Sequence, residues 1–364
     1  MRRLVVSSAL HFAMSAALCL AAGFVSSPAK SQCNSGLIAF ALSPAIRAYG
    51  MGDTGAADAA DPLNAFYNPA VISSSGETFF AGAYAPLFRS EDDDTYVWHA
   101  AAGAGFSFAA TQSIELHLGA GAAFSYVAHS SWRDPNILIV CNYLLDEKLL
   151  ALTLGGEAVY RDMLHLGIGI ALKPLWFKAE QSYPYGAPPA TGNGIAYDLG
   201  FLLSADFLKG VGLRLSPSIG FSVLNMGGDI VLWDDWQGDL SLPRNYRLGL
   251  GMRFEGPRKK FLGTEVPLFV LAVNWDGRED YDEEPFYSEP EGDWDMRGLG
   301  AEGAFLETLF LRIGSVAEPE EGDLSTGVGI GLATGRFRGR VDYAFVDRER
   351  PDEYKYGVSF GYRF

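Results

Sequence analysis

The chain ends on Tyr354-Lys-Tyr-Gly-Val-Ser-Phe-Gly-Tyr-Arg-Phe364, a stretch in which two kinds of side chain alternate strictly. Tyrosine, phenylalanine and valine occupy the even-numbered positions, whereas lysine, glycine, serine and arginine occupy the odd ones. A period of two predicts a β-strand with two chemically different faces. In a soluble protein a second sheet would cover the aromatic face, whereas in a membrane barrel this face meets lipid. The stretch alone leaves both interpretations open.

Length and composition favour the membrane. The chain has 364 residues, of which 48% are hydrophobic and 43 are glycine, and it is long for one soluble domain. After the N-terminus, no segment offers the ~20 consecutive apolar residues of a spanning helix. Residues 1–29 combine Arg2 and Arg3, an apolar run and a small-residue site at Ser27-Pro28-Ala29, which predicts a secretory signal peptide. An uncleaved anchor helix is the alternative.

Charge argues against a nucleic-acid-binding protein, and the number of cysteines argues against a domain held together by disulfides. Removing Arg2 and Arg3 with the signal peptide changes the formal charge from -16 to -18, which argues against nucleic acid as a partner. Cys33 and Cys141 are the cysteines that remain, and two are too few to staple a domain of this size. The sequence does not decide whether they are free.

Alternation like that of the C-terminal stretch recurs along the chain from Glu77 onwards. It predicts an all-β fold, a transmembrane antiparallel β-barrel of about 14 strands over residues 77–364. The predicted strands are 77–88, 95–108, 113–127, 149–160, 164–178, 194–206, 211–225, 243–255, 266–277, 294–306, 308–317, 324–333, 336–346 and 354–364.

The lengths of the connections distinguish a barrel from a sandwich. Connections after odd-numbered strands are longer or strongly polar, as at 128–148, whereas those after even-numbered strands are mostly short, as at 334–335. Only 256–265 breaks this pattern. Long loops on one side, with short turns and both termini on the other, are typical of outer-membrane barrels. We therefore expect a location in the bacterial outer membrane, among lipid and lipopolysaccharide, with Tyr362 and Phe364 forming the C-terminal insertion signal.

Acidic residues gather in the long loops, for example at 279–293 and 347–353. Such loops are either simply solvated or hold divalent cations that bridge to lipopolysaccharide. Because charges are costly against hydrocarbon, the arginines that alternate with aromatic residues are predicted to face the barrel interior. The predicted lumen charges are Arg247, Arg253, Arg312, Arg338, Arg340, Asp342 and Arg363.

Residues 30–76, which precede the first strand, are rich in glycine and alanine and alternate poorly. Asp61-Pro62 and Asn68-Pro69 each place a capping side chain before a proline, a pattern that favours short helical turns. Small residues and tight turns suit a segment tucked inside the barrel as a hatch or plug. An ordinary periplasmic extension is the alternative.

The hatch hypothesis predicts a set of ion pairs. Carboxylates of Asp53, Asp58 and Asp61 are expected to pair with arginines of the wall, while Arg47 pairs with an inward acid such as Asp342. In the alternative, the arginines pair with wall acids and water, and the lumen is an open polar pore.

The sequence favours no enzyme, cofactor or metal site. The mature chain has His99, His117, His129 and His165, and each is isolated in sequence. None has the spacing of metal ligands, and none stands beside a recognisable nucleophile.

Residues 43–70, together with the C-terminal half, resemble the PorV/PorQ family within the larger group of FadL-like outer-membrane transport barrels. The residues that carry the resemblance are Ser43-Pro44, Arg47-Ala48, Gly50-Met51-Gly52-Asp53, Gly55, Asp61 and Asn68-Pro69-Ala70. By this resemblance, the hatch motif consists of Arg47, Gly50, Gly52, Asp53, Asp61, Asn68, Pro69 and Ala70.

The resemblance implies a fourteen-stranded barrel with a luminal hatch, and it implies two functions. PorV-like proteins take part in type IX secretion as cargo shuttles, and their partners are secreted cargo domains or secretion-channel subunits. FadL-like proteins take up fatty acids or other hydrophobic small molecules. Gly50-Met51-Gly52-Asp53 looks nearer to the PorV side, and Val71 stands where FadL-like hatches usually have glycine. The sequence therefore favours protein export, with hydrophobic uptake as the alternative and a structural or adhesive barrel as the third possibility.

Overall fold

A computed structural model gives the fold of most of the chain. The predicted signal peptide, Cys33, Cys141, Arg363 and Phe364 lie outside the described residues. The structure describes residues 37–41, 43–75, 78–89, 94–130, 143–181, 190–230, 232–233, 242–280, 296–317, 322–347 and 353–362.

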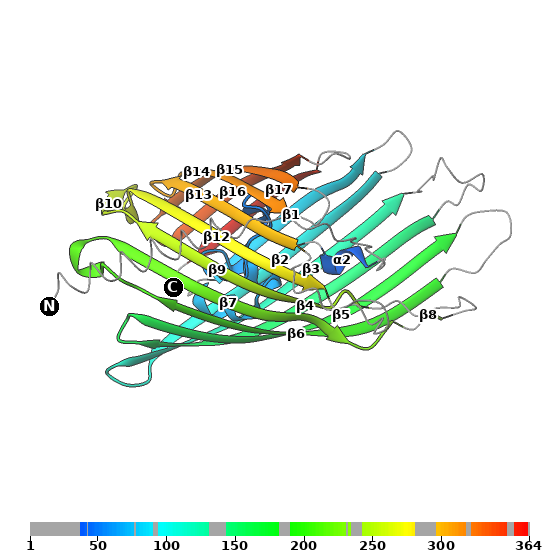
Figure 1. Cartoon of the computed structure of the whole chain (residues 1–364), viewed down its shortest axis with the longest axis horizontal. Helices are drawn as coiled ribbons and strands as arrows, with labels where there is room; N and C mark the ends of the chain where they lie inside the picture. The colour runs from blue at the N-terminus through cyan, green and yellow to red at the C-terminus, as the bar shows by residue number, and fades with distance from the viewer. Residues whose placement is uncertain are drawn as a thin grey trace.

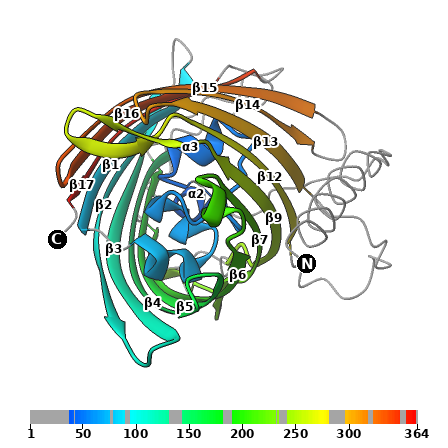
Figure 2. The same ribbon diagram turned by 90° about the vertical axis from the view of Figure 1, so that its left-hand side faces the viewer.

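Fourteen long antiparallel strands of the described chain form a closed barrel, which confirms the predicted fold class. Figure 1 shows them tilted in one direction, and Figure 2 shows the ring that they make. They are β1 (Thr78–Arg89), β2 (Asp94–Ala109), β3 (Ile114–Ser130), β4 (Tyr143–Tyr160), β5 (Leu164–Gln181), β6 (Ala190–Ala205), β7 (Arg214–Gly227), β9 (Asn245–Glu255), β12 (Phe269–Asp280), β13 (Met296–Phe305), β14 (Leu309–Ala317), β15 (Gly322–Thr334), β16 (Phe337–Asp347) and β17 (Glu353–Tyr362).

The first and last strands close the ring. β1 pairs with β17 in a register that runs from Thr78 opposite Tyr362 to Tyr84 opposite Tyr356. Every other long strand pairs with the long strands before and after it in sequence. Closure leaves no unpaired edge in the wall, which is the condition for a sheet to span hydrocarbon.

The two faces of the wall follow the alternation in the sequence. Outward side chains are apolar and exposed, with Ile330 66%, Val341 57% and Phe360 47% accessible. Inward side chains in the same region, such as Asp342 and Lys355, are buried against the contents of the barrel. The pattern predicted for the C-terminal strands therefore holds.

Some elements differ from the prediction in extent. β4 begins at Tyr143, six residues before the predicted start at 149, and His129 belongs to β3 rather than to a loop. The connection 256–265, which is too long for the short-turn side, folds into a hairpin of its own from β10 (Arg258–Phe261) and β11 (Thr264–Pro267). The short strand β8 (Leu232–Trp233) adds to β6, and the 3₁₀ turn η3 (Lys209–Val211) lies between β6 and β7.

The N-terminal segment lies inside the ring of strands, as the blue ribbon in Figure 2 shows. It consists of α2 (Ile38–Ala41), α3 (Ile46–Tyr49), η1 (Pro62–Phe66) and η2 (Pro69–Ser75). The 3₁₀ helix η1 begins where the capping pattern predicts, because Asp61 Oδ1 accepts a hydrogen bond from the Leu63 amide at 3.0 Å. Among the described residues, no helix is long and apolar enough to cross a bilayer.

Candidate functional site inside the barrel

Arg47 is the central ion-pairing residue of the luminal segment. Its side chain is 2% exposed, and its Nε and Nη2 atoms lie 2.9 and 3.0 Å from the two carboxylate oxygens of Glu302 on β13. Nη1 donates to Asp58 of the same segment. A buried guanidinium is stable only when its charge is paired and its donors are used. Arg47 therefore fixes helix α3 to the wall.

Arg47 pairs with an inward acid of the wall, but this acid is Glu302 and not Asp342, the example that the sequence offered. Asp342 Oδ1 accepts from Arg312 at 2.7 Å, and Oδ2 accepts from Arg340 at 2.5 Å, so wall arginines occupy both of its oxygens. Arg312 also donates to Glu302 at 2.7 Å. Arg47 thus joins a wall network through Glu302 on β13, which lies three strands away from Asp342 on β16 in the sheet order.

Two acids of the segment pair with wall arginines. Asp61 Oδ2 lies 2.6 Å from Arg340 Nη2, and Asp53 Oδ2 lies 3.3 Å from Arg247 Nη2. The guanidinium of Arg247 also lies over the ring of Tyr67, 4.6 Å from its centroid. These contacts connect two parts of the segment to two separate wall strands, β16 and β9.

Asp58 differs from the expectation that it would meet a wall arginine. It pairs with Arg47 of its own segment and accepts a hydrogen bond from Asn274 on β12 at 3.0 Å. Burial by itself would raise the pKa of Asp58, but the Arg47 charge and the hydrogen bond from the Ala60 amide hold that pKa below its ordinary value. Asp58 is therefore an internal brace of the segment.

Two further arginines pair with acidic residues of the wall itself, which is the pairing that the open-pore alternative predicts. Arg253 Nε lies 3.0 Å from Glu255, and Arg338 Nη2 lies 3.7 Å from Glu307. Both kinds of pairing thus occur together in one lumen.

Polar groups that the sequence interpretation missed hold the segment's backbone. Asp276 Oδ2 on β12 accepts from the amides of Gly55 and Ala56, both at 2.8 Å. Ser325 Oγ accepts from the Gly52 amide at 2.8 Å, and Ser222 Oγ donates to the Tyr67 carbonyl at 2.6 Å. The signal was present, because Asp276, Ser325 and Glu302 share the inward register of their strands.

Glycines of the wall and segment allow close backbone contact. Gly52 has φ +71°, and a Cβ there would lie 2.5 Å from the Ser315 carbonyl and 2.7 Å from that of Leu299. A Cβ on Gly249 of the wall would lie 2.7 Å from the Ala57 amide nitrogen. The segment therefore packs directly against the backbone of the sheet, which side chains at these positions would prevent.

The remaining residues of the hatch motif also contact the wall. Gly50 lies against Gly327 of β15, and Pro69 and Ala70 lie beside Gly200 of β6. Asn68 Nδ2 donates to the Ala56 carbonyl at 2.7 Å and to the Phe201 carbonyl at 2.8 Å. All eight predicted hatch-motif residues are thus part of one packed luminal segment.

Towards the long connections the interior holds a large apolar cluster, beside which Glu147 accepts from the Ala39 amide and Lys173 lies over the Phe40 ring. α2 packs there with buried residues from the halves of the strands that lead into the long loops. The members of this cluster are Leu37, Ala39, Phe40, Ala85, Val97, Val127, Leu149, Leu175, Phe177, Ala196, Ile230 and Leu242.

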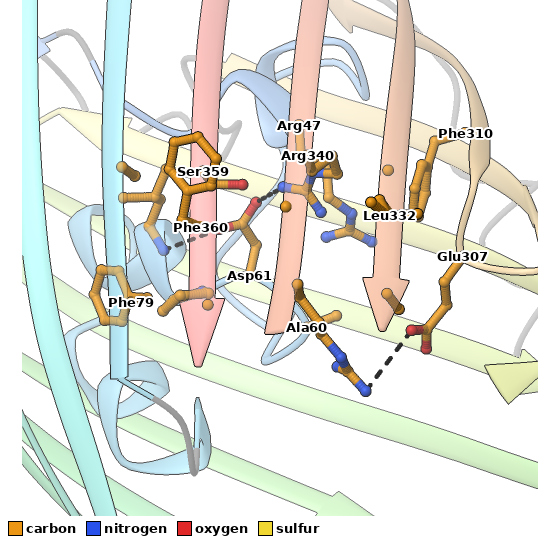
Figure 3. A pocket seen from close by; sticks show the side chains of 18 of the residues that line it. Arg47, Ala60, Asp61, Phe79, Glu307, Phe310, Leu332, Arg340, Ser359 and Phe360 are labelled. Carbon is orange, nitrogen blue, oxygen red and sulfur yellow. Dashed lines mark hydrogen bonds and ion pairs between the residues drawn. The ribbon is translucent and has the colours of Figure 1, made fainter. Parts of the chain in front are cut away.

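Towards the short turns the interior is polar. A cavity of about 470 Å³ lies between the segment and the wall, and Asp58, Arg253 and His165 are among its lining residues. A second cavity of about 170 Å³ adjoins Asp61 and Arg340, whose side chains point towards each other in Figure 3. The segment therefore separates an apolar region from a polar one.

Two histidines that are distant in sequence meet at the polar end. His117 Nδ1 lies 2.9 Å and His165 Nδ1 lies 3.5 Å from Glu157, which also accepts from Ser74 at 3.0 Å. His165 Nε2 lies 3.2 Å from Asp206, which follows β6. The two histidines are isolated in sequence but meet in the fold, because strands β3, β4 and β5 are neighbours. Among the described residues, no group of three or more His, Cys, Asp or Glu side chains is arranged to hold a metal.

Comparison with known proteins gives a likeness of fold. No family model matches the chain, and no curated protein matches its sequence. Among solved structures, the toluene transporter TodX of Pseudomonas putida matches with a TM-score of 0.52 at 12% identity, over 87% of this chain and 97% of TodX.

Two further structures are similar. A TodX deltaS2S3 mutant, described as a monoaromatic hydrocarbon channel, matches with a TM-score of 0.50 at 11% identity, over 88% of this chain and 98% of the mutant. A Pseudomonas aeruginosa FadL homologue matches at 0.47 and 11% identity, over 89% and 99% of the two chains. At such low identity the likeness concerns the fold alone, the closed antiparallel barrel that the described strands form.

Proposed function

We propose that this protein is a transport barrel of the bacterial outer membrane, in which the N-terminal segment acts as a hatch for hydrophobic small molecules. The single observation that carries the proposal is the position of that segment. It fills the lumen between the apolar cluster and the polar cavity, and ion pairs and hydrogen bonds to the wall hold it there. A barrel that served only as a structural element would have no need of a separately anchored interior segment.

The polarity of the interior supports the choice of ligand. On the side of the long connections, Val97, Val127 and Leu149 belong to a buried apolar cluster that α2 covers, and movement of the segment would offer this cluster to a hydrophobic molecule. Apolar surfaces favour hydrocarbon ligands because transfer out of water stabilises them by about 25 cal/mol per Å². The neighbouring TodX structures carry the descriptions toluene transporter and monoaromatic hydrocarbon channel, which names a ligand class to test first.

Uptake by cells tests this proposal. The full chain is expressed in a Gram-negative host that lacks its own barrel for hydrophobic compounds, and uptake of radiolabelled toluene and of radiolabelled palmitate is measured. We expect uptake of at least one probe above that of the same host with an empty vector. A barrel that migrates as folded in unheated gel samples but gives no uptake of either probe contradicts the proposal.

Protein export in the manner of PorV is the second candidate, and the Gly50-Met51-Gly52-Asp53 motif favours it. Pull-down of the tagged barrel from mild detergent extracts distinguishes the two candidates. Export predicts recovery of secreted cargo domains or secretion-channel subunits, whereas uptake predicts a barrel that retains bound lipid or hydrocarbon.

A further inference from the structure

The hairpin of β10 and β11, residues 258–267, contrasts in charge with the rest of the chain. The chain carries a formal charge of -16, yet this hairpin holds Arg258, Lys259 and Lys260 against the single acid Glu265. All three basic residues are exposed. Lys259 and Lys260 form no ion pair with any described residue, whereas Arg258 lies 3.5 Å from Glu255. We call residues 258–267 the basic hairpin.

Aromatic side chains of the wall lie at both ends of the basic hairpin. At its root, Phe254 and Phe269 contact each other with ring centroids 5.8 Å apart. At its tip, Thr334 Oγ1 donates to the Leu262 carbonyl at 3.3 Å, close to Phe337, which is 40% exposed. Aromatic girdles mark the interface between hydrocarbon and headgroups in membrane barrels. The hairpin therefore runs along the level of the headgroups.

The tip has features of a membrane-contacting surface. Leu262 is 53% exposed and has φ +47°, although glycine, asparagine or aspartate is preferred at such a position in a tight hairpin. Arg336, in the adjoining turn between β15 and β16, is also exposed. An apolar side chain among lysines and arginines suits an interface in which the chain's apolar atoms contact acyl tails and its cations contact phosphates.

We propose that the basic hairpin, with Arg336, is a binding surface for anionic phospholipid headgroups in the periplasmic leaflet. The inference rests on the proposed outer-membrane location, which places the short-turn side of the barrel, where the hairpin lies, in the periplasm. Lys259 and Lys260 bind the phosphates, and Leu262 lies among the upper parts of the acyl chains. The basic charge of the hairpin is complementary to an anionic headgroup, and the exposed Leu262 together with the aromatic residues at both ends favours a lipid over an acidic protein as the occupant.

The test measures lipid preference directly. The full-length barrel is reconstituted with equal parts of phosphatidylglycerol and phosphatidylcholine, and native mass spectrometry counts the lipids of each kind that stay bound. We expect a preference for phosphatidylglycerol, which the double variant Lys259→Gln/Lys260→Gln lowers at least fivefold, since each cation near an anionic surface contributes roughly that factor. Added salt should weaken the preference in the wild type.

Controls separate charge from folding. Lys259→Arg/Lys260→Arg keeps the charge and is expected to keep the preference. Lys148→Gln removes one positive charge, half of the change in the double variant, at the opposite end of the barrel, where Lys148 is 48% exposed, and is expected to leave the preference unchanged. Equal ratios of bound phosphatidylglycerol to phosphatidylcholine for the wild type and the Gln double variant overturn the proposal. A hairpin that binds an acidic protein but shows no lipid preference overturns it as well. Toluene uptake is scored separately, so failure of the transport proposal is distinguishable from failure of this one.

Discussion

Arg47 and Glu302 are 255 positions apart in sequence and form a two-point ion pair inside the barrel, with Nε···Oε2 2.9 Å and Nη2···Oε1 3.0 Å. Each side chain is 2% exposed, so neither charge is screened by water. The pair connects the N-terminal segment to the wall. Arg312 and Asp342 continue the ion-pair network from this point.

Removing Arg47 should release the segment. Arg47→Met leaves Asp58 and Glu302 as buried carboxylates that lack this partner, and breaking a buried pair from one side typically costs about 3–5 kcal/mol. We expect higher and noisier conductance in planar bilayers than for the wild type. Arg47→Lys should recover only part of the effect, because an ammonium cannot make the two-point contact. A conductance for Arg47→Met equal to that of the wild type would count against the role of this residue.

A methyl group on Gly52 should displace the segment in a different way. The Cβ of Gly52→Ala would overlap the carbonyls of Ser315 and Leu299, and the backbone there has φ +71°, so the change combines a clash with strain. We expect a lower melting temperature and easier proteolysis of the segment. Gly212→Ala is the matched control, because Gly212 has φ +74° and no heavy atom lies within 4 Å of a Cβ at that position. Identical behaviour of the two variants would argue against close packing at Gly52.

Acid should weaken the segment's internal brace. The folded-state pKa of Asp58 lies below its ordinary value because of Arg47, so the pair contributes its full stability above about pH 4 and loses it as the pH falls through the lower, folded-state pKa. We expect conductance to stay low at pH 5 and to rise in strong acid. In Asp58→Asn this part of the acid response should be missing. A conductance that rises with increasing pH instead would show that other groups control the segment.

Deleting the segment should open the lumen. Without residues 43–70 the interior loses the groups that pair with Arg247, Glu302 and Arg340, and water can replace them. We expect a large, steady ohmic conductance, provided that unheated gel migration shows a folded barrel. A folded deletion variant whose conductance matches that of the intact chain would mean that the segment does not block the path.

The wall of this barrel was predictable because its rules are local. Strict alternation in stretches such as 336–346 and 354–364 identifies strands and their outward faces, and the sorting of long and short connections identifies the closed ring. The extra length of β4 was missed because Tyr143–Lys148 includes charged residues, which can continue a strand beyond the membrane. The hairpin at 258–267 was missed because its strands are only four residues long.

The types of residue inside the barrel were predictable from the sequence, but their pairing was not. Sequence alone shows that arginines and acids share the lumen, but the choice of Glu302 over Asp342 for Arg47 depends on the rotation and depth of α3 within the ring. The meeting of His117, Glu157 and His165 depends on the register between β3, β4 and β5, which pairs His117 with Glu157 and places His165 one strand further. Such contacts require the three-dimensional arrangement, because no local pattern encodes them.

A reversible tether tests the central claim, that the segment must move for transport, most directly. A Cβ on Gly50 would lie 3.5 Å from the Cβ of Ala344 on β16, which is within the range that a disulfide spans. Gly50→Cys/Ala344→Cys, made in a chain whose native cysteines are replaced by serine, joins the segment to the wall. We predict that toluene or palmitate uptake is lost in the oxidised protein and returns after reduction, while the single-cysteine variants transport in both states. Undiminished uptake with the disulfide demonstrably formed would contradict the account.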